Sequence, residues 1–137
     1  MVKKFLQWIE SKPKNLFLID GVGALVSAFF LGVILVRFEW FFGIPASILY
    51  YLAILPVFFA IYDFFSYQKD NQQIAPYLRG IAILNLLYCC LSIGLTIYHQ
   101  ETITIWGWLY ILNEIIIIVS LVIFELKTAK KLTEQLT

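Results

Sequence analysis

The sequence predicts an all-α integral membrane protein, a four-transmembrane-helix bundle with a short N-terminal interfacial amphipathic helix. Of its 137 residues, 61% are hydrophobic and only 14% are charged, which is more apolar surface than a soluble domain of this length can bury. Four apolar stretches, near 16–36, 44–66, 79–98 and 103–125, are each about as long as the roughly 20 residues that a helix needs to cross the hydrocarbon. None of them alternates between apolar and polar residues as the strands of a β-barrel do.

The composition divides the chain into three regions. Residues 1–15 are predicted to form a cytoplasmic amphipathic helix on the membrane surface, interrupted by Pro13. Its apolar stripe on a helical wheel consists of Val2, Phe5, Leu6, Trp8 and Ile9. Residues 16–126 form the single transmembrane domain, and residues 127–137 form a basic cytoplasmic tail.

Lysine and arginine are distributed very unevenly between the two sides that four spans define. With both termini on the same side, nine of the ten basic residues fall on that side and only Arg37 falls on the other. The nine are Lys3, Lys4, Lys12, Lys14, Lys69, Arg79, Lys127, Lys130 and Lys131. Because basic residues accumulate in cytoplasmic segments, we expect both termini in the cytoplasm and the chain in a cell membrane, inner or plasma.

The first two spans carry small residues, an acid and two prolines. Small side chains follow Asp20 along one side of the first span, at Gly23, Ala24, Ser27 and Ala28. Such spacing lets another helix approach closely, and we expect a tight helix contact there in preference to a substrate groove. In the second span Pro45 suits the first turn, whereas the interior Pro56 predicts a kink that shapes the bundle, with a hinge as the alternative.

The third and fourth spans each carry a polar stripe. On the third the stripe consists of Asn85, Tyr88, Cys89, Ser92, Thr96 and His99, and on the fourth of Tyr110, Asn113, Glu114 and Ser120. Because a short loop joins the two spans, we expect the stripes to face each other. The predicted intramembrane polar site consists of Glu114, Asn113, Asn85, Tyr110, Tyr88 and Ser92.

Glu114 interrupts the almost purely aliphatic stretch "ILNEIIIIVSLVIF". No Lys or Arg lies at the same depth, so a buried ion pair is not expected. An acid surrounded by hydrocarbon favours its neutral form and still requires hydrogen bonds, for which Asn85, Tyr88 and Tyr110 are suitable partners.

The remaining charges gather at two levels. Near the cytoplasmic surface Asp20, Asp63, Arg79 and Glu125 are predicted to form a salt-bridged ring around Arg79 that acts as a structural latch. On the outer side a mouth cluster of Arg37, Glu39, His99 and Glu101 is the alternative to four separate water-exposed loop residues, and the separate residues are preferred.

These patterns leave the biochemical role open between two classes. An interaction or assembly protein with a polar interhelical seam is slightly favoured, and a small proton-sensitive transporter or channel-like protein with a midplane site around Glu114 is the alternative. The expected partners are the lipid bilayer and either a second copy or another membrane protein. Nothing in the sequence predicts catalytic residues, a cofactor or a metal site, and the net charge of +1 does not indicate a nucleic-acid partner.

Overall fold

The computed structural model describes residues 2–69 and 73–136. Within these ranges the side chains of residues 5, 6, 9–11, 135 and 136 lie outside the described part. The predicted apolar stripe of the N-terminal helix is therefore described only at Val2 and Trp8, and both of these side chains are exposed.

All regular structure in the described residues is helical. The elements are α1 (Val2–Ser11), α2 (Asn15–Phe29), the π-helical η1 (Phe30–Leu35), α3 (Glu39–Phe42), α4 (Ala46–Tyr67), α5 (Ile74–Tyr98) and α6 (Ile105–Leu136). Four segments are long and apolar enough to cross a membrane, namely Asn15–Leu35, Ala46–Tyr67, Ile74–Tyr98 and Ile105–Glu134. The prediction of four apolar spanning-length helices is confirmed.

Two helices are longer than the hydrophobic stretches that predicted them. α5 begins at Ile74 rather than near residue 79, because Pro76 lies in its first turn, where a missing backbone N–H breaks no helical hydrogen bond. α6 continues to Leu136, so the segment predicted as a basic tail is mostly helical. That segment contains three Lys and two Leu and lacks Gly and Pro, which permits continuation of the helix.

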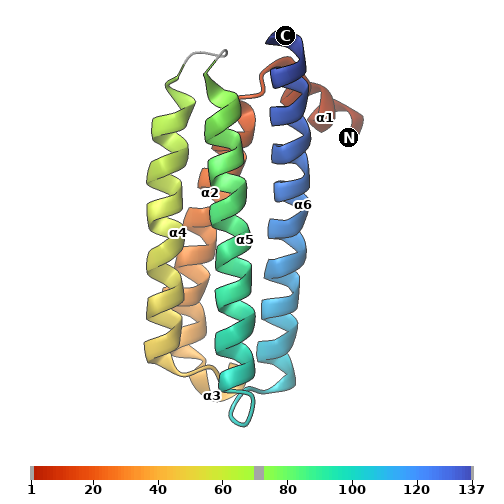
Figure 1. The fold of residues 1–137 in the computed structure, drawn as a ribbon. Helices are drawn as coiled ribbons and strands as arrows, with labels where there is room; N and C mark the ends of the chain where they lie inside the picture. The colour runs from red at the N-terminus through yellow and green to blue at the C-terminus, as the bar shows by residue number, and fades with distance from the viewer. Residues whose placement is uncertain (1, 70–72, 137) are drawn as a thin grey trace.

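The four long helices follow one another around the bundle in chain order (Figure 1). α2 packs most extensively on α4, and α5 packs most extensively on α6, while α4 and α5 join these two pairs. One buried apolar cluster lies toward the α3 end and includes Leu31, Leu49 and Ile103. A second lies toward the α1 end and includes Phe17 and Leu78. The middle of the bundle between these clusters holds the polar residues.

The short helix α3 ties the two pairs together at one end. Its C-terminus turns at Gly43, whose φ of 73° is left-handed, a conformation that glycine adopts without steric cost. The Thr104 hydroxyl donates to the Phe41 carbonyl at 2.6 Å and the Thr104 N–H donates to the Phe42 carbonyl at 3.1 Å. The Phe41 ring stacks on Trp106 with centroids 5.3 Å apart. The α3 segment is thereby joined to the start of α6.

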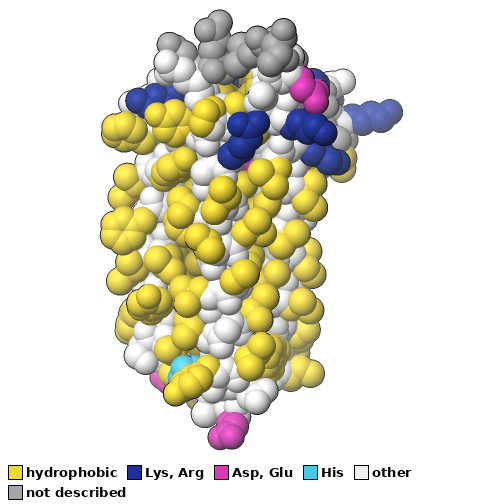
Figure 2. Space-filling view, in the orientation of Figure 1, with side chains coloured by type: hydrophobic (Ala, Val, Ile, Leu, Met, Phe, Trp, Pro, Cys, Tyr) yellow, Lys and Arg dark blue, Asp and Glu magenta, His cyan; other side chains and the backbone are white. Residues whose placement is uncertain are grey.

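The outer surface is apolar along most of the bundle. Figure 2 shows hydrophobic side chains along the face in view and Lys and Arg side chains gathered at the end where α1 and the C-terminal part of α6 lie. At the α3 end, exposed aromatic residues include Phe38, Trp40, Tyr98 and Trp106. An apolar band bounded by aromatic and basic residues is typical of helical membrane proteins.

Candidate functional site

A cavity of about 290 Å³ lies in the middle of the bundle. Its polar lining consists of Asp20, Ser27, Asn85, Tyr88, Tyr110 and Glu114. Its apolar lining includes Val26, Phe30, Pro56, Phe59, Ile117 and Leu121. The volume is at the lower end of the roughly 300–1,000 Å³ that is usual for ligand pockets, and the combination of apolar walls with a few polar groups is also usual for them.

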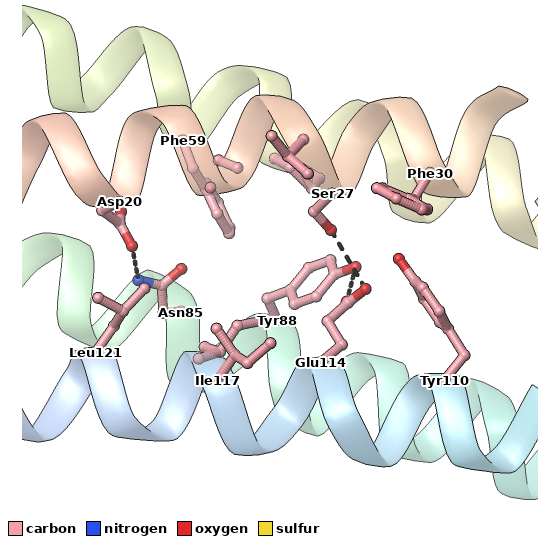
Figure 3. Close-up of a pocket in the computed structure, with 15 residues that line it drawn as sticks. Asp20, Ser27, Phe30, Phe59, Asn85, Tyr88, Tyr110, Glu114, Ile117 and Leu121 are labelled. Atoms are coloured by element: carbon pink, nitrogen blue, oxygen red, sulfur yellow. Dashed lines mark hydrogen bonds between the residues drawn. The ribbon is translucent and has the colours of Figure 1, made fainter. Parts of the chain in front are cut away.

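Glu114 forms the polar centre at one end of this cavity. The Tyr88 hydroxyl donates to Glu114 Oε1 at 2.6 Å, and the Ser27 hydroxyl donates to Glu114 Oε2 at 3.3 Å. The Tyr110 side chain also points into this end of the cavity from α6 (Figure 3). Tyr88 is fixed in turn by an edge-to-face contact with Phe59, with ring centroids 6.1 Å apart. Both carboxyl oxygens therefore have a hydrogen-bond donor, and the group is held in one orientation.

Asp20 and Asn85 form a second polar centre at the opposite end (Figure 3). The Asn85 amide donates to Asp20 Oδ1 at 3.0 Å and to Glu125 Oε1 at 3.5 Å. Asp20 and Ser27 are seven residues apart on α2, which corresponds to about 10 Å along a helix axis. The cavity thus connects two acidic centres that lie at different depths in the bundle.

The cavity opens between α2 and α6. These two helices do not pack extensively on each other in the described part of the chain. Val26 on α2, Phe30 at the start of η1 and Ile117 on α6 line the cavity and are also exposed on the outer surface. A Cβ atom added at Gly23 would meet no atom within 4 Å. The tight helix contact expected for this stretch is therefore wrong at Gly23, because α6 does not approach α2 there.

Close helix contact on the first span occurs instead at two other glycines. A Cβ atom at Gly21 would lie 3.3 Å from the Asp63 Cβ, and one at Gly32 would lie 3.3 Å from the Ala53 Cβ. Both contacts join the first span to α4, at positions that the predicted small-residue stripe did not include. The stripe itself contributes Gly23, Ala24 and Ser27 to the cavity.

The structure brings together most of the predicted intramembrane polar residues. Glu114, Tyr88 and Tyr110 surround one end of the cavity, and Asn85 lies at the other. Ser92 is buried but does not line the cavity, and its hydroxyl oxygen has no hydrogen-bond partner among the residues that the structure describes. Asn113 is exposed on the outside of α6 and is a wrong assignment to this site, because adjacent residues of a helix point about 100° apart.

The predicted charge ring is only partly present. Asp20, Asp63 and Glu125 are all buried and lie close enough to interact electrostatically. Arg79 is exposed, and its guanidinium donates to the Thr133 hydroxyl at 2.7 Å. None of the three acids forms an ion pair with a basic residue in the described part of the chain. The salt-bridged ring around Arg79 is therefore wrong, because the helical extension of α6 supplies Arg79 with a different partner.

The residues of the predicted outer mouth have separate local roles. Glu39 Oε1 accepts a hydrogen bond of 3.2 Å from the Ala46 N–H at the start of α4. The His99 ring packs on Tyr98, and its Nδ1 lies 3.0 Å from the Leu95 carbonyl oxygen. Arg37 and Glu101 are exposed. No hydrogen bond or ion pair joins these four residues within the described ranges, in agreement with the preferred reading of separate loop residues.

Three residues that line the cavity were not among the residues predicted for the site, namely Ser27, Phe30 and Phe59. Ser27 was visible only as one of several small residues on the first span, although its position two turns from Asp20 placed it on the same side. The two phenylalanines had no distinguishing signal among the 12 in the chain. Their part in the site depends on which faces of η1 and α4 turn inward.

Comparisons with protein-family models, with curated proteins and with solved structures each found no match for this chain. Among the described residues, no group of three or more His, Cys, Asp or Glu side chains is placed to hold a metal ion. The polar side of the cavity consists of carboxyl, phenol, hydroxyl and amide groups. Groups of these kinds bind protons, cations and hydrogen-bond donors.

Proposed function

We propose that this chain is an integral membrane protein that binds a lipophilic organic cation in the cavity between α2 and α6 and exchanges it for a proton. The four helices of spanning length support membrane insertion. The Lys and Arg side chains at the α1 end support a cytoplasmic location for that end and for both termini. This proposal puts the transport role ahead of the assembly role that the sequence slightly favoured.

One observation carries the proposal: Glu114 is held by two hydroxyl donors inside a largely apolar cavity that has no basic residue in its lining. A carboxyl group in such a setting attracts a cation far more strongly than it would in water. If Glu114 is protonated in the empty cavity, an arriving cation displaces this proton, which leaves to water while the carboxylate pairs with the cation. Cation binding and proton release are then one exchange.

The lining defines the class of cation. The aromatic rings of Phe30, Phe59, Tyr88 and Tyr110 border the cavity, and aromatic faces attract quaternary and other organic ammonium groups. Aliphatic side chains supply the remaining wall, so the ligand should carry apolar substituents beside its charge. The opening between α2 and α6 would let such a molecule enter from the hydrocarbon side of the membrane.

Benzyltrimethylammonium is a suitable probe because its permanent charge prevents free diffusion across a lipid bilayer. The Ala24→Leu variant should place a larger aliphatic side chain in the cavity and reduce binding of this cation by tenfold or more, because the bound ligand and the new side chain compete for the same space. Binding is measured by titration calorimetry in detergent, and uptake is measured in proteoliposomes with an imposed pH gradient.

Val22→Leu is the matched control, because Val22 lies on the exposed side of the same helix and does not line the cavity. It should bind and take up the cation as the wild type does. Equal binding by the wild type and Ala24→Leu, with both folded, would contradict a ligand site in this cavity. If the cation binds but is not taken up into proteoliposomes, the result would support a ligand site in the cavity and contradict the transport role.

The assembly role remains as a second candidate because of the outer face of α6. Asn113 and Ser120 are exposed on this face, one heptad apart, among exposed aliphatic residues that include Leu109 and Ile116. The Ser120 hydroxyl donates to the Ile116 carbonyl at 2.9 Å, whereas the Asn113 side chain has no hydrogen-bond partner within the described residues. Polar side chains at such positions hydrogen-bond between helices of different chains in a membrane.

If two copies pair through this face, Asn113→Leu should weaken the pairing by roughly 0.6–2 kcal/mol, or about 3- to 30-fold in the dissociation constant. The dissociation constant is measured by analytical ultracentrifugation or by energy transfer between labelled copies in detergent. The control is Leu86→Asn, which places an amide on an exposed position of α5 instead. A wild type that remains monomeric in lipid would contradict this second candidate.

A further inference from the structure

Each of the four long helices contributes one buried polar residue at the same level, near the α1 end of the bundle. The residues are Asp20 on α2, Asp63 on α4, Asn85 on α5 and Glu125 on α6, and we call them the acid cluster. Asp63 and Glu125 are both 0% exposed, and Asp20 is 4% exposed. Three buried carboxyl groups therefore share the Asn85 amide as their main hydrogen-bond donor.

The donors of the acid cluster do not match its acceptors. The Asn85 amide supplies hydrogen bonds to Asp20 Oδ1 and Glu125 Oε1. Asp20 Oδ2, both Oδ atoms of Asp63 and Glu125 Oε2 have no hydrogen-bond partner in the described part of the chain. Buried oxygens without donors are costly, and buried like charges repel one another.

Within the acid cluster, Asp63 is fully buried and neither of its carboxyl oxygens accepts a hydrogen bond from the described residues. It lies close enough to Asp20 for the two carboxyl groups to interact electrostatically. The approach is close because Gly21 has no side chain: an added Cβ there would lie 3.8 Å from Asp63 Oδ2. Two ionised carboxylates buried side by side repel each other, and neither has a proton to donate. A proton on one of the two groups would remove the repulsion and supply the missing donor.

No basic residue in the described part of the chain pairs with the acid cluster. The titratable groups that interact with it are its own three acids and the phenol of Tyr62. The Tyr62 hydroxyl donates away from the acids, to the Tyr77 carbonyl at 3.0 Å. Arg79 is exposed and donates to Thr133 on the outside of the bundle. The negative charge of the acid cluster is lowered when one of its carboxylates takes up a proton.

We propose that the acid cluster is a proton-binding site in which Asp20 and Asp63 share a proton. The proton is taken from water, so that one carboxylate becomes a carboxylic acid that donates to the other carboxylate. Asn85 positions Asp20 and Glu125 for this arrangement through its two hydrogen bonds. Asp20 and Asn85 also line the cavity, which gives the proton a route to Glu114 at the other end. The site does not depend on whether the cavity binds an organic cation.

Infrared spectroscopy of the purified protein tests the proton directly, because protonated carboxyl groups absorb apart from carboxylates and amides. In the Glu114→Gln variant, residue 114 is an amide and cannot contribute to the protonated-carboxyl band. This band should nevertheless remain near neutral pH. Adding Asp63→Asn should remove most of this band, because the new amide can donate to Asp20 without a proton. Glu101→Gln is the matched control on the exposed surface and should leave the band unchanged.

Absence of the band in Glu114→Gln near neutral pH would overturn the proposal without any substitution in the acid cluster. Persistence of the full band in the folded Asp63→Asn double variant would also overturn it. If Asp63→Asn does not fold, Asp20→Asn replaces it with the same expectation. Replacing choline chloride by sodium chloride distinguishes a proton from a metal cation: a band that sodium removes would assign the site to the cation and overturn proton binding.

Thermal unfolding gives an independent readout of the same proton. Carboxyl groups of the unfolded chain are ionised above about pH 5, so a folded state that retains the shared proton binds more protons than the unfolded state. Stability then falls as the pH rises. The melting temperature of the wild type should decrease between about pH 6 and pH 9, and Asp63→Asn should flatten this decrease. An equal slope in both proteins would contradict a shared proton.

Discussion

Glu114→Gln is expected to weaken binding of benzyltrimethylammonium by about 30-fold or more. Glutamine keeps the size of the side chain, and its amide oxygen can accept from one of the two hydroxyl groups while its NH2 donates to the other. It cannot carry the negative charge that pairs with the cation. Removing one partner of a buried charge pair costs about 2 kcal/mol or more. With tenfold in affinity for each 1.4 kcal/mol, this corresponds to about 30-fold.

The measurement compares this cation with neopentylbenzene, a neutral molecule of the same shape, by titration in detergent. Both proteins should bind the neutral molecule equally, because the apolar walls of the cavity are unchanged. An equal loss of affinity for both molecules would show that the substitution has altered the cavity rather than a charge interaction. Proton release on binding of the cation, followed with a pH indicator in weak buffer, should be present in the wild type and absent in Glu114→Gln.

Gly43→Ala is expected to lower the free energy of unfolding by about 2–4 kcal/mol. The φ of 73° is unfavourable for alanine. An added Cβ atom would also overlap the Thr102 carbonyl oxygen and lie 2.8 Å from the Thr104 nitrogen. Both are backbone atoms of the connection between α5 and α6, so the overlap can be relieved only by separating α3 from α6. The free energy is measured by reversible denaturation in mixed micelles.

Gly94→Ala is the matched control for this prediction. Gly94 is exposed within α5, and an added Cβ atom there would meet nothing within 4 Å. Alanine is favoured over glycine in a helix by about 1 kcal/mol, so the control should be neutral or slightly more stable. If both substitutions had the same effect, the contact of Gly43 with the segment 102–104 would not contribute to stability.

Several features of the fold were predictable because they depend on local sequence. Each spanning helix satisfies its backbone hydrogen bonds internally, so a long apolar run is enough to predict it. The polar stripe of α5 was also predictable, because residues such as Asn85, Tyr88 and Ser92 recur with helical spacing and are buried as expected. The start of α5 and the end of α6 were not. α5 begins before Pro76, which is tolerated in its first turn, and the polar end of α6 relies on helix propensity and not on hydrophobicity.

The predictability of the site was limited by the rotation and spacing of the helices. Asn113 and Glu114 are adjacent in the sequence, and only the packing of α6 on α5 decides that Glu114 faces Tyr88 while Asn113 faces outward. Arg79 had the right depth to neutralise the acids, but it lies on the exposed side of α5 and bonds to Thr133. Ser27 reaches Glu114 over a separation of 87 residues, which no local pattern reports.

By itself the sequence determined the number of helices that are long and apolar enough to span a membrane and their approximate places in the chain. It also determined that Glu114 lies in the middle of one such helix and that Asp20 lies near the end of another. These follow from hydrophobicity and helical periodicity, which act within one segment. Only the tertiary structure decided that α2 and α6 stand apart, that the small residues of α2 border a cavity instead of a helix, and that three acids meet without a basic partner. The physical reason is that side-chain packing between distant segments fixes helix rotation, and a rotation of one residue, about 100°, exchanges a buried group for an exposed one.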